Sequence, residues 1–368
     1  MSRELIHALV FSAPTVCALV CIVVLLLDIF FTKKNREEKR LRLFLSFTLM
    51  IVAMCWFGLV LQVVNHKAFI CYTSIFLLTL MLDQILIYRF VHIITVTGRR
   101  SRFYRSHFVL PVVLTTVAII TDLIVPFQQQ EVAIYGGEGE GSRWFAALYS
   151  LTGIVFVVYN TLYPLLGLLR IRLYRLNIKD FSADAQRTTL NWLSVLLMLT
   201  LLTIPIPLTG LLFNIDVFSD FYFSMQGVIP SFFIYTIMCY NLVSDNFVII
   251  TPDDENLQGT VAEIDVKRFT RYMREKKPYL NPHLRITDVA SDLYTNRSYV
   301  SAFINRTYNV NFSHLINSYR LKELDRLRLS PEHKKNTGLE LALMAGFSNY
   351  RSYLRVKKEE DEAIVLLL

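Results

Sequence analysis

Four polar side chains stand inside long apolar stretches of the sequence, where they could bind a ligand or simply hold helices together. They are Asp83, Gln84, Asp122 and Asn160. A carboxylate in the middle of a bilayer costs about 3 kcal/mol or more unless it faces protein and finds a partner. As neighbours, the four could form a ligand pocket or a proton-responsive switch. They could equally form hydrogen bonds between helices that only fix the packing. Both interpretations stay open.

The residue types that enzymes commonly use form no recognisable constellation. The seven histidines are scattered, and the sequence has no P-loop, no glycine-rich nucleotide fingerprint and no HExxH motif. The cysteines lie in or beside apolar runs and form no CxxC pair, so we expect buried, inert thiols rather than disulfides. They are Cys17, Cys21, Cys55, Cys71 and Cys239. We therefore expect no enzyme activity, no cofactor and no metal.

The composition is that of a membrane protein with a basic polar end. Of the 368 residues, 54% are hydrophobic and 18% are charged, against about 45–50% and about 25% in soluble domains. These values exclude a disordered protein and argue against a purely soluble one. The net charge is +8, and most of the basic excess follows residue 262.

Seven apolar runs are long enough to cross a bilayer, whose core of about 30 Å needs roughly 20 helical residues. They cover about 11–31, 43–64, 69–94, 108–127, 144–169, 190–213 and 222–243. Asp28 and a charged stretch end the first run where a signal peptide would have its cleavage site, so we expect a helix of the mature protein. The sequence predicts a seven-helix transmembrane bundle over residues 1–243.

The loops between these runs predict their orientation. Lys and Arg gather after the first, third and fifth runs, within 33–42, 99–105 and 170–187. Because basic loops remain in the cytoplasm, we expect the N-terminus outside and residues 244–368 inside. The longest outer loop, about 128–143, contains a glycine-rich stretch that we expect to be a flexible connector. We find none of the inverted halves or paired broken helices that mark many transporters.

The pattern turns helical after a polar connector at 244–262. Thr287 and Asn296 are suitable caps for two short helices, and the small Ala290 suits the contact between them. A longer helix and a second short pair around Gly346-Phe347-Ser348 follow. The predicted helices cover about 288–293, 297–308, 312–329, 339–345 and 349–358.

These elements resemble the C-terminal DNA-binding domain of the AraC/XylS family of transcription regulators, over about residues 263–358. The resemblance is carried, in the family's order and near its spacing, by Ile286–Ala290, Asn296–Ser301, Asn311-Phe312, Ile316-Asn317, Tyr319–Leu321, Ala345–Ser348 and Tyr353–Arg355. It implies an all-α fold in which a central helix joins two helix-turn-helix units. Each unit would place a recognition helix in the major groove of double-stranded DNA.

The resemblance also implies which side chains meet DNA. In the first unit they are Arg297, Ser298, Ser301, Ala302 and Asn305, and in the second Tyr350, Arg351, Ser352 and Arg355. Arg can pair with guanine and Asn with adenine, whereas Ser accepts either base. Four further basic residues either contact phosphate or are merely solvated: Lys322, Arg326, Lys334 and Lys335.

The end of the sequence departs from the family's pattern. Val356 runs directly into Lys357-Lys358, where the family has an aromatic residue, and the atypical tail 359–368 replaces the family's closing segment. Residues 332–341 are also more polar than in the family. These differences predict a degenerate second unit that folds or binds DNA less well than the first.

Together these features suggest a membrane-embedded transcription regulator of the bacterial inner membrane. Its seven helices would sense an unknown small-molecule or protein signal and pass it through 244–262 to a domain that binds specific DNA sequences. A homodimer would raise the effective concentration of that domain on DNA. The alternative is a seven-helix receptor or transporter whose basic tail binds a protein or the anionic membrane surface.

Overall fold

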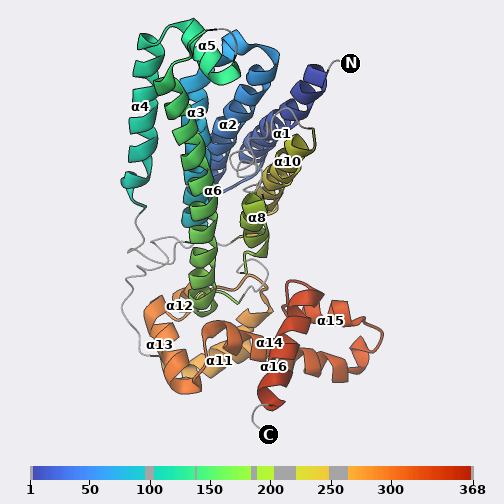
Figure 1. The fold of residues 1–368 in the computed structure, drawn as a ribbon. Coiled ribbons are helices and arrows are strands. Elements are labelled where there is room, and N and C mark those ends of the chain that lie inside the picture. The colour runs from blue at the N-terminus through green and yellow to red at the C-terminus, as the bar shows by residue number, and fades with distance from the viewer. Residues whose placement is uncertain are drawn as a thin grey trace. The chain divides into compact units, whose positions relative to one another are not determined.

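The computed structural model describes most of the chain, namely residues 3–95, 103–136, 139–183, 189–202, 221–247 and 264–365. Within these ranges it contains fourteen α-helices and no strand beyond one isolated bridge (Figure 1). The predicted all-α class is confirmed for this part of the chain. Two compact units form, one of residues 1–95, 102–171 and 191–245 and the other of residues 96–101, 172–190 and 246–368.

The first unit holds the apolar helices. They are α1 (Arg3–Phe31), α2 (Arg36–Val64), α3 (His66–Ile94), α4 (Val109–Ile124), α5 (Phe127–Tyr135), most of α6 (Arg143–Asn177), α8 (Asn191–Leu202) and α10 (Phe221–Val243). Five segments are long and apolar enough to cross a membrane: Leu5–Phe31, Arg36–Val64, His66–Ile94, Arg105–Ile124 and Arg143–Asp180. They overlap the first five predicted spans. Residues 203–213 of the sixth predicted span lie outside the described residues, so the seven-span arrangement stays a prediction.

Helix α1 illustrates why these helices suit a bilayer. It packs against α2 and α10 through buried residues such as Phe11, Ala18 and Leu25, while Val20 and Val23 are exposed on the outside. A helix that is apolar all round is stable only inside a large core or in lipid.

A buried arginine ties three of these helices together. The Arg42 side chain on α2 is fully buried and donates to the carboxylates of Asp28 on α1, at 2.6 Å, and Asp245 just after α10, at 2.7 Å. It also donates to the carbonyl oxygen of Leu242 at 2.6 Å. Two carboxylates and a carbonyl thus compensate the loss of water around one guanidinium.

The loop expected at 128–143 is partly helical, which corrects the prediction of a flexible connector throughout. Helix α5 follows Pro126. The Gln130 side chain donates to the carbonyl oxygens of Asp122, at 3.1 Å, and Val125, at 2.8 Å. These bonds satisfy carbonyls at the end of α4 that have no partner within that helix.

The second unit contains six complete helices, and the last five follow the predicted order. They are α11 (Val266–Lys276), α12 (Ile286–Asp292), α13 (Arg297–Tyr308), α14 (Phe312–Leu329), α15 (Gly338–Met344) and α16 (Tyr350–Val365). The bounds of α13 and α14 match the prediction. Helix α12 begins before the predicted cap Thr287, because the Asp288 carboxylate accepts from the Arg285 amide at 2.8 Å. Helix α16 runs on through most of the segment predicted as a tail. Residues 248–262 of the predicted connector lie outside the described residues.

Side-chain caps fix where most of these helices start. The side-chain oxygen of Asp265, Asn296, Asn311 or Thr337 accepts the backbone N–H three residues on, at the start of α11, α13, α14 and α15 respectively. Asn349 caps α16 in the same way. Such caps satisfy N–H groups that have no carbonyl partner in the first helical turn.

Candidate nucleic-acid interface

The first short helix pair consists of α12 and α13, joined by a tight turn. Tyr294 adopts the left-handed conformation with φ of 52°, and the Thr295 amide donates to the Ala290 carbonyl at 2.9 Å. Ala290, Val300 and Ile304 are completely buried. The small Ala290 side chain therefore lies in the core of this pair, as its size led us to expect.

The outer face of α13 carries the residues expected to meet DNA. Ser298, Ala302 and Asn305 are exposed, and Arg297 and Ser301 are half-buried. Val300, Phe303 and Ile304 of the helix are buried, so the three exposed side chains face away from the core. Such a face could reach base edges once the helix enters a groove.

The second short pair, α15 and α16, has its own packed core. Leu321, Leu324 and Leu327 of α14 form one buried cluster with residues of this pair, namely Leu341, Ala342, Ala345, Phe347, Tyr353 and Val356. Aromatic contacts between Phe347 and Tyr353, with ring centroids 5.6 Å apart, lie in this cluster. Val356, after which the sequence departs from the family's pattern, is itself part of this buried cluster.

Three of the four DNA-contact residues predicted on α16 are exposed, and one is not. Tyr350, Arg351 and Arg355 lie on the surface. Ser352 is buried, and its hydroxyl donates to the Asn349 carbonyl at 2.8 Å. Ser352 therefore helps to form the start of α16, and we leave it out of the proposed surface.

Arg320 on α14 organises the centre of the second unit. The side chain is buried and donates to the carbonyls of Tyr279 and Asn281, each at 2.8 Å, and to the Asn317 side chain at 3.1 Å. Its guanidinium also lies 5.9 Å from the centre of the Phe347 ring. One side chain thus connects α14 to the turn after α11 and to the second helix pair.

The four possible phosphate-binding residues are exposed. Lys322, Lys334 and Lys335 are exposed, whereas Arg326 pairs with Glu323 at 2.7 Å. The pKa of the Glu323 carboxyl lies below its usual value, mainly because Arg326 donates a hydrogen bond to it. Burial opposes this shift, and Lys277 adds to it. Arg326 is therefore partly neutralised, and the three lysines are better placed for phosphate.

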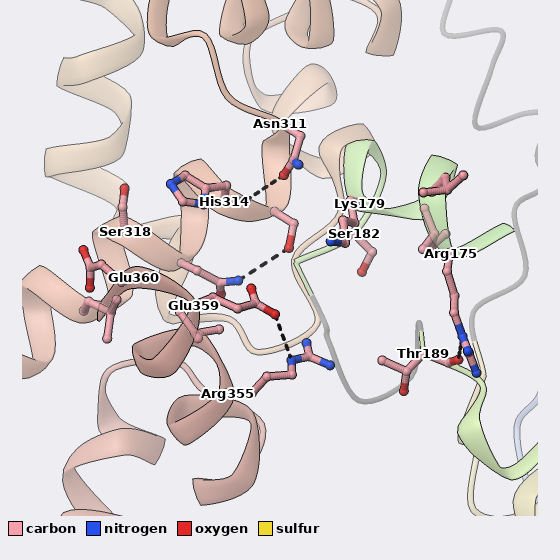
Figure 2. Close-up of a pocket in the computed structure, with 16 residues that line it drawn as sticks. Arg175, Lys179, Ser182, Thr189, Asn311, His314, Ser318, Arg355, Glu359 and Glu360 are labelled. Atoms are coloured by element: carbon pink, nitrogen blue, oxygen red, sulfur yellow. Dashed lines mark hydrogen bonds and ion pairs between the residues drawn. The ribbon is translucent and has the colours of Figure 1, made fainter. Parts of the chain in front are cut away.

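A cavity of about 360 Å³ lies among the end of α6, the residues that follow it, and the helices α14 and α16 (Figure 2). Its lining mixes charges, with Lys179 and Arg355 beside Glu359 and Glu360. Figure 2 shows Arg355 directed toward Glu359, at 3.8 Å, and Arg175 directed toward the Thr189 carbonyl, at 2.6 Å. Because opposite charges face one another, the lining favours no single class of ligand.

The four polar residues within the apolar helices are not joined to one another as one cluster. The Asp83 carboxylate accepts from Gln84 at 3.4 Å, and its other oxygen has no hydrogen-bond partner among the described residues. Asp122 accepts from the Ser74 hydroxyl, and Asn160 donates to the Phe156 carbonyl of its own helix at 2.9 Å. Asp122 and Asn160 thus have local partners, whereas Asp83 lacks a full set.

Sequence reasoning missed one neighbour of α13. The Phe181 ring lies under the Arg297 guanidinium, 5.1 Å from ring centre to the central carbon. In the sequence, the one indication that this segment is buried is an apolar Phe among the polar residues Lys179, Asp180 and Ser182. This pattern does not indicate that Phe181 contacts a residue more than a hundred positions away.

Neither a metal site nor a known relative helps to identify the function of this surface. In the part of the chain that the structure describes, no three His, Cys, Asp or Glu side chains come close enough to hold a metal ion. In comparisons with protein-family models, curated proteins and solved structures, nothing matches this chain.

Proposed function

We propose that the protein is a membrane-embedded transcription regulator. The observation that carries the proposal is the arrangement of two short helix pairs, α12–α13 and α15–α16, on either side of the single helix α14. In each pair an asparagine-capped second helix presents polar residues outward from its first turns. Helix-turn-helix proteins use this arrangement to place one helix in the major groove.

The proposed partner is double-stranded DNA. Arg297, Ser298, Ser301, Ala302 and Asn305 would contact base edges from α13, and Tyr350, Arg351 and Arg355 from α16. Exposed lysines such as Lys335 would bind phosphate, which gives affinity and orientation but no sequence preference.

The apolar helices provide the support for the membrane part of the proposal. Five of them have the length and composition to cross a bilayer. We place the protein in a bacterial inner membrane with its C-terminus in the cytoplasm. There the helices respond to a small-molecule or protein signal, which Asp83 could help to sense. A ligand acts by binding one arrangement of the helices more tightly than another.

The proposal can be tested by mixing the full chain, in lipid nanodiscs, with random DNA duplexes and sequencing the duplexes that it binds. The wild-type protein should enrich a defined sequence. Arg297→Ala should cost about 1–3 kcal/mol of preference at one base pair. Lys335→Ala is the matched control, because it also removes one positive charge. It should weaken binding to all sequences alike, and it should reduce the slope of log affinity against log salt concentration by about one.

Binding that follows only total charge and salt would contradict this function. It would favour a seven-helix receptor or transporter whose basic C-terminal part binds a protein or an anionic membrane surface.

A further inference from the structure

The residues that directly follow α6 are part of the second unit's fold. After the short turn Ile178–Asp180, the chain forms an antiparallel bridge between Ser182 and Arg285. The Ile286 amide donates to the Phe181 carbonyl at 3.0 Å, and the Ala183 amide to the Leu284 carbonyl at 3.3 Å. These bonds attach the segment 178–183 to the start of α12.

The segment is also buried. Ile178, Phe181 and Ala183 are at most 2% exposed. They are buried even though two charged residues, Lys179 and Asp180, lie between them in the sequence. Arg320, at the centre of the unit, donates to the Ala183 carbonyl at 3.0 Å. Loops normally run over the surface, so this one is better described as core of the unit that contains α12 and α13.

Phe181 brings this segment into contact with the proposed DNA surface. Its fully buried ring lies 5.1 Å from the Arg297 guanidinium, and Arg297 is the first residue of α13. A guanidinium that stacks on an aromatic ring uses its flat face. Its N–H donors lie at the edge, and these are the groups that pair with O6 and N7 of guanine. In general, a guanidinium stacked on a ring can therefore still pair with a base.

Fixing the direction of a long side chain before binding lowers the entropy lost on binding. Arg297 has many rotamers in water, whereas contact with the Phe181 ring favours those that place the guanidinium near the ring.

We propose that Phe181 is a positioning residue for Arg297, so that the loop between the fifth and sixth predicted spans sets part of the DNA sequence preference. This inference rests on the proposed function. It extends the DNA-binding unit beyond residues 263–358 to the segment 178–183. The segment follows α6 directly in the chain and joins α12 through backbone hydrogen bonds.

The test is again selection from random duplexes by the full chain in nanodiscs, now with variants at position 181. Phe181→Leu keeps an apolar side chain and removes the ring face, and Phe181→Met is a second ring-free variant. Each should lower the preference at the base pair that Arg297→Ala also affects, by about fivefold. Protection of the Ile286 amide from hydrogen exchange checks that the segment still packs on α12.

Double variants separate positioning from a purely structural role. In an Arg297→Ala background, Phe181→Leu should have no further effect, whereas in an Arg351→Ala background its effect should add in full. A loss of affinity for all sequences that persists without Arg297 would overturn the inference. So would unchanged preference in both ring-free variants, and in that case the proposed function would stand. A wild-type protein that enriches no sequence would overturn both.

Discussion

Arg320 and Glu323 lie within one turn of α14, and both charges are withdrawn from water. Arg320 donates to backbone carbonyls, whereas Glu323 accepts from Lys277, at 3.1 Å, and from Arg326. A buried charge that loses its partners is strongly destabilising. Neither side chain lies on the proposed DNA surface, so their expected role is to hold α14 in place.

The shifted pKa of Glu323 makes a prediction about acid. Because partners lower the pKa in the folded state, the stabilisation is complete above the unfolded value of about 4.3 and is lost as the pH falls through the lower folded value. The protection factors of the α14 amides in the full chain, in which the pH dependence of intrinsic exchange is removed, should therefore fall below about pH 4. Glu323→Gln should be less protected at neutral pH and should lack this acid-dependent step.

Asp325→Asn provides the matched control for this experiment. Asp325 is 69% exposed and lies 3.6 Å from Arg328, and such surface pairs contribute about 0–1 kcal/mol. This variant should keep the acid-dependent step. An equal effect of both variants would show that the partners of Glu323 do not matter.

At the scale of elements, the turn between α15 and α16 depends on one glycine. Gly346 has a φ of +94°, and a Cβ there would lie 2.3 Å from the Tyr279 carbonyl oxygen. The turn can thus press against the backbone that Arg320 also binds. The second helix pair and the turn after α11 are coupled through this contact.

Gly346→Ala should therefore destabilise the second helix pair by about 3 kcal/mol, from backbone strain and from the clash. Limited proteolysis of the full chain should show new cleavage between α14 and α16. Gly338→Ala is the control, because a Cβ there makes only ordinary contact with Tyr350, at 3.4 Å. It should leave cleavage unchanged or reduce it. Equal cleavage in both variants would contradict this account of the turn.

The sequence was most informative about elements with local signals. The Asn296 cap and apolar spacing predicted α13, and the helical pattern over 312–329 predicted α14, both with the bounds that the structure has. Helix α5 was missed because the glycine run after it dominated the interpretation of that loop. The contact of Phe181 with Arg297 was missed because it depends on two segments far apart in the chain. Burial of Ser352 could not be foreseen from its residue type alone.

At the scale of the whole molecule, the distribution of Lys and Arg predicts the topology. An epitope tag inserted in the loop after α5, at Gly139, should be reached by antibody in intact cells. A tag after Leu368 should be reached only after the membrane is permeabilised. A C-terminal tag that is accessible in intact cells would contradict the proposed orientation and, with it, access to chromosomal DNA.

Helix α6 is a single uninterrupted element from Arg143 to Asn177 and supplies both compact units. Under the proposed function, the recognition helices belong to a chain that is embedded in the membrane, so they stay at the cell envelope. A target promoter would have to travel to the cell envelope, and how often it is occupied would depend on where its locus sits in the nucleoid. Moving that locus between envelope-proximal and central chromosomal positions would then change its expression, with the regulator itself unaltered.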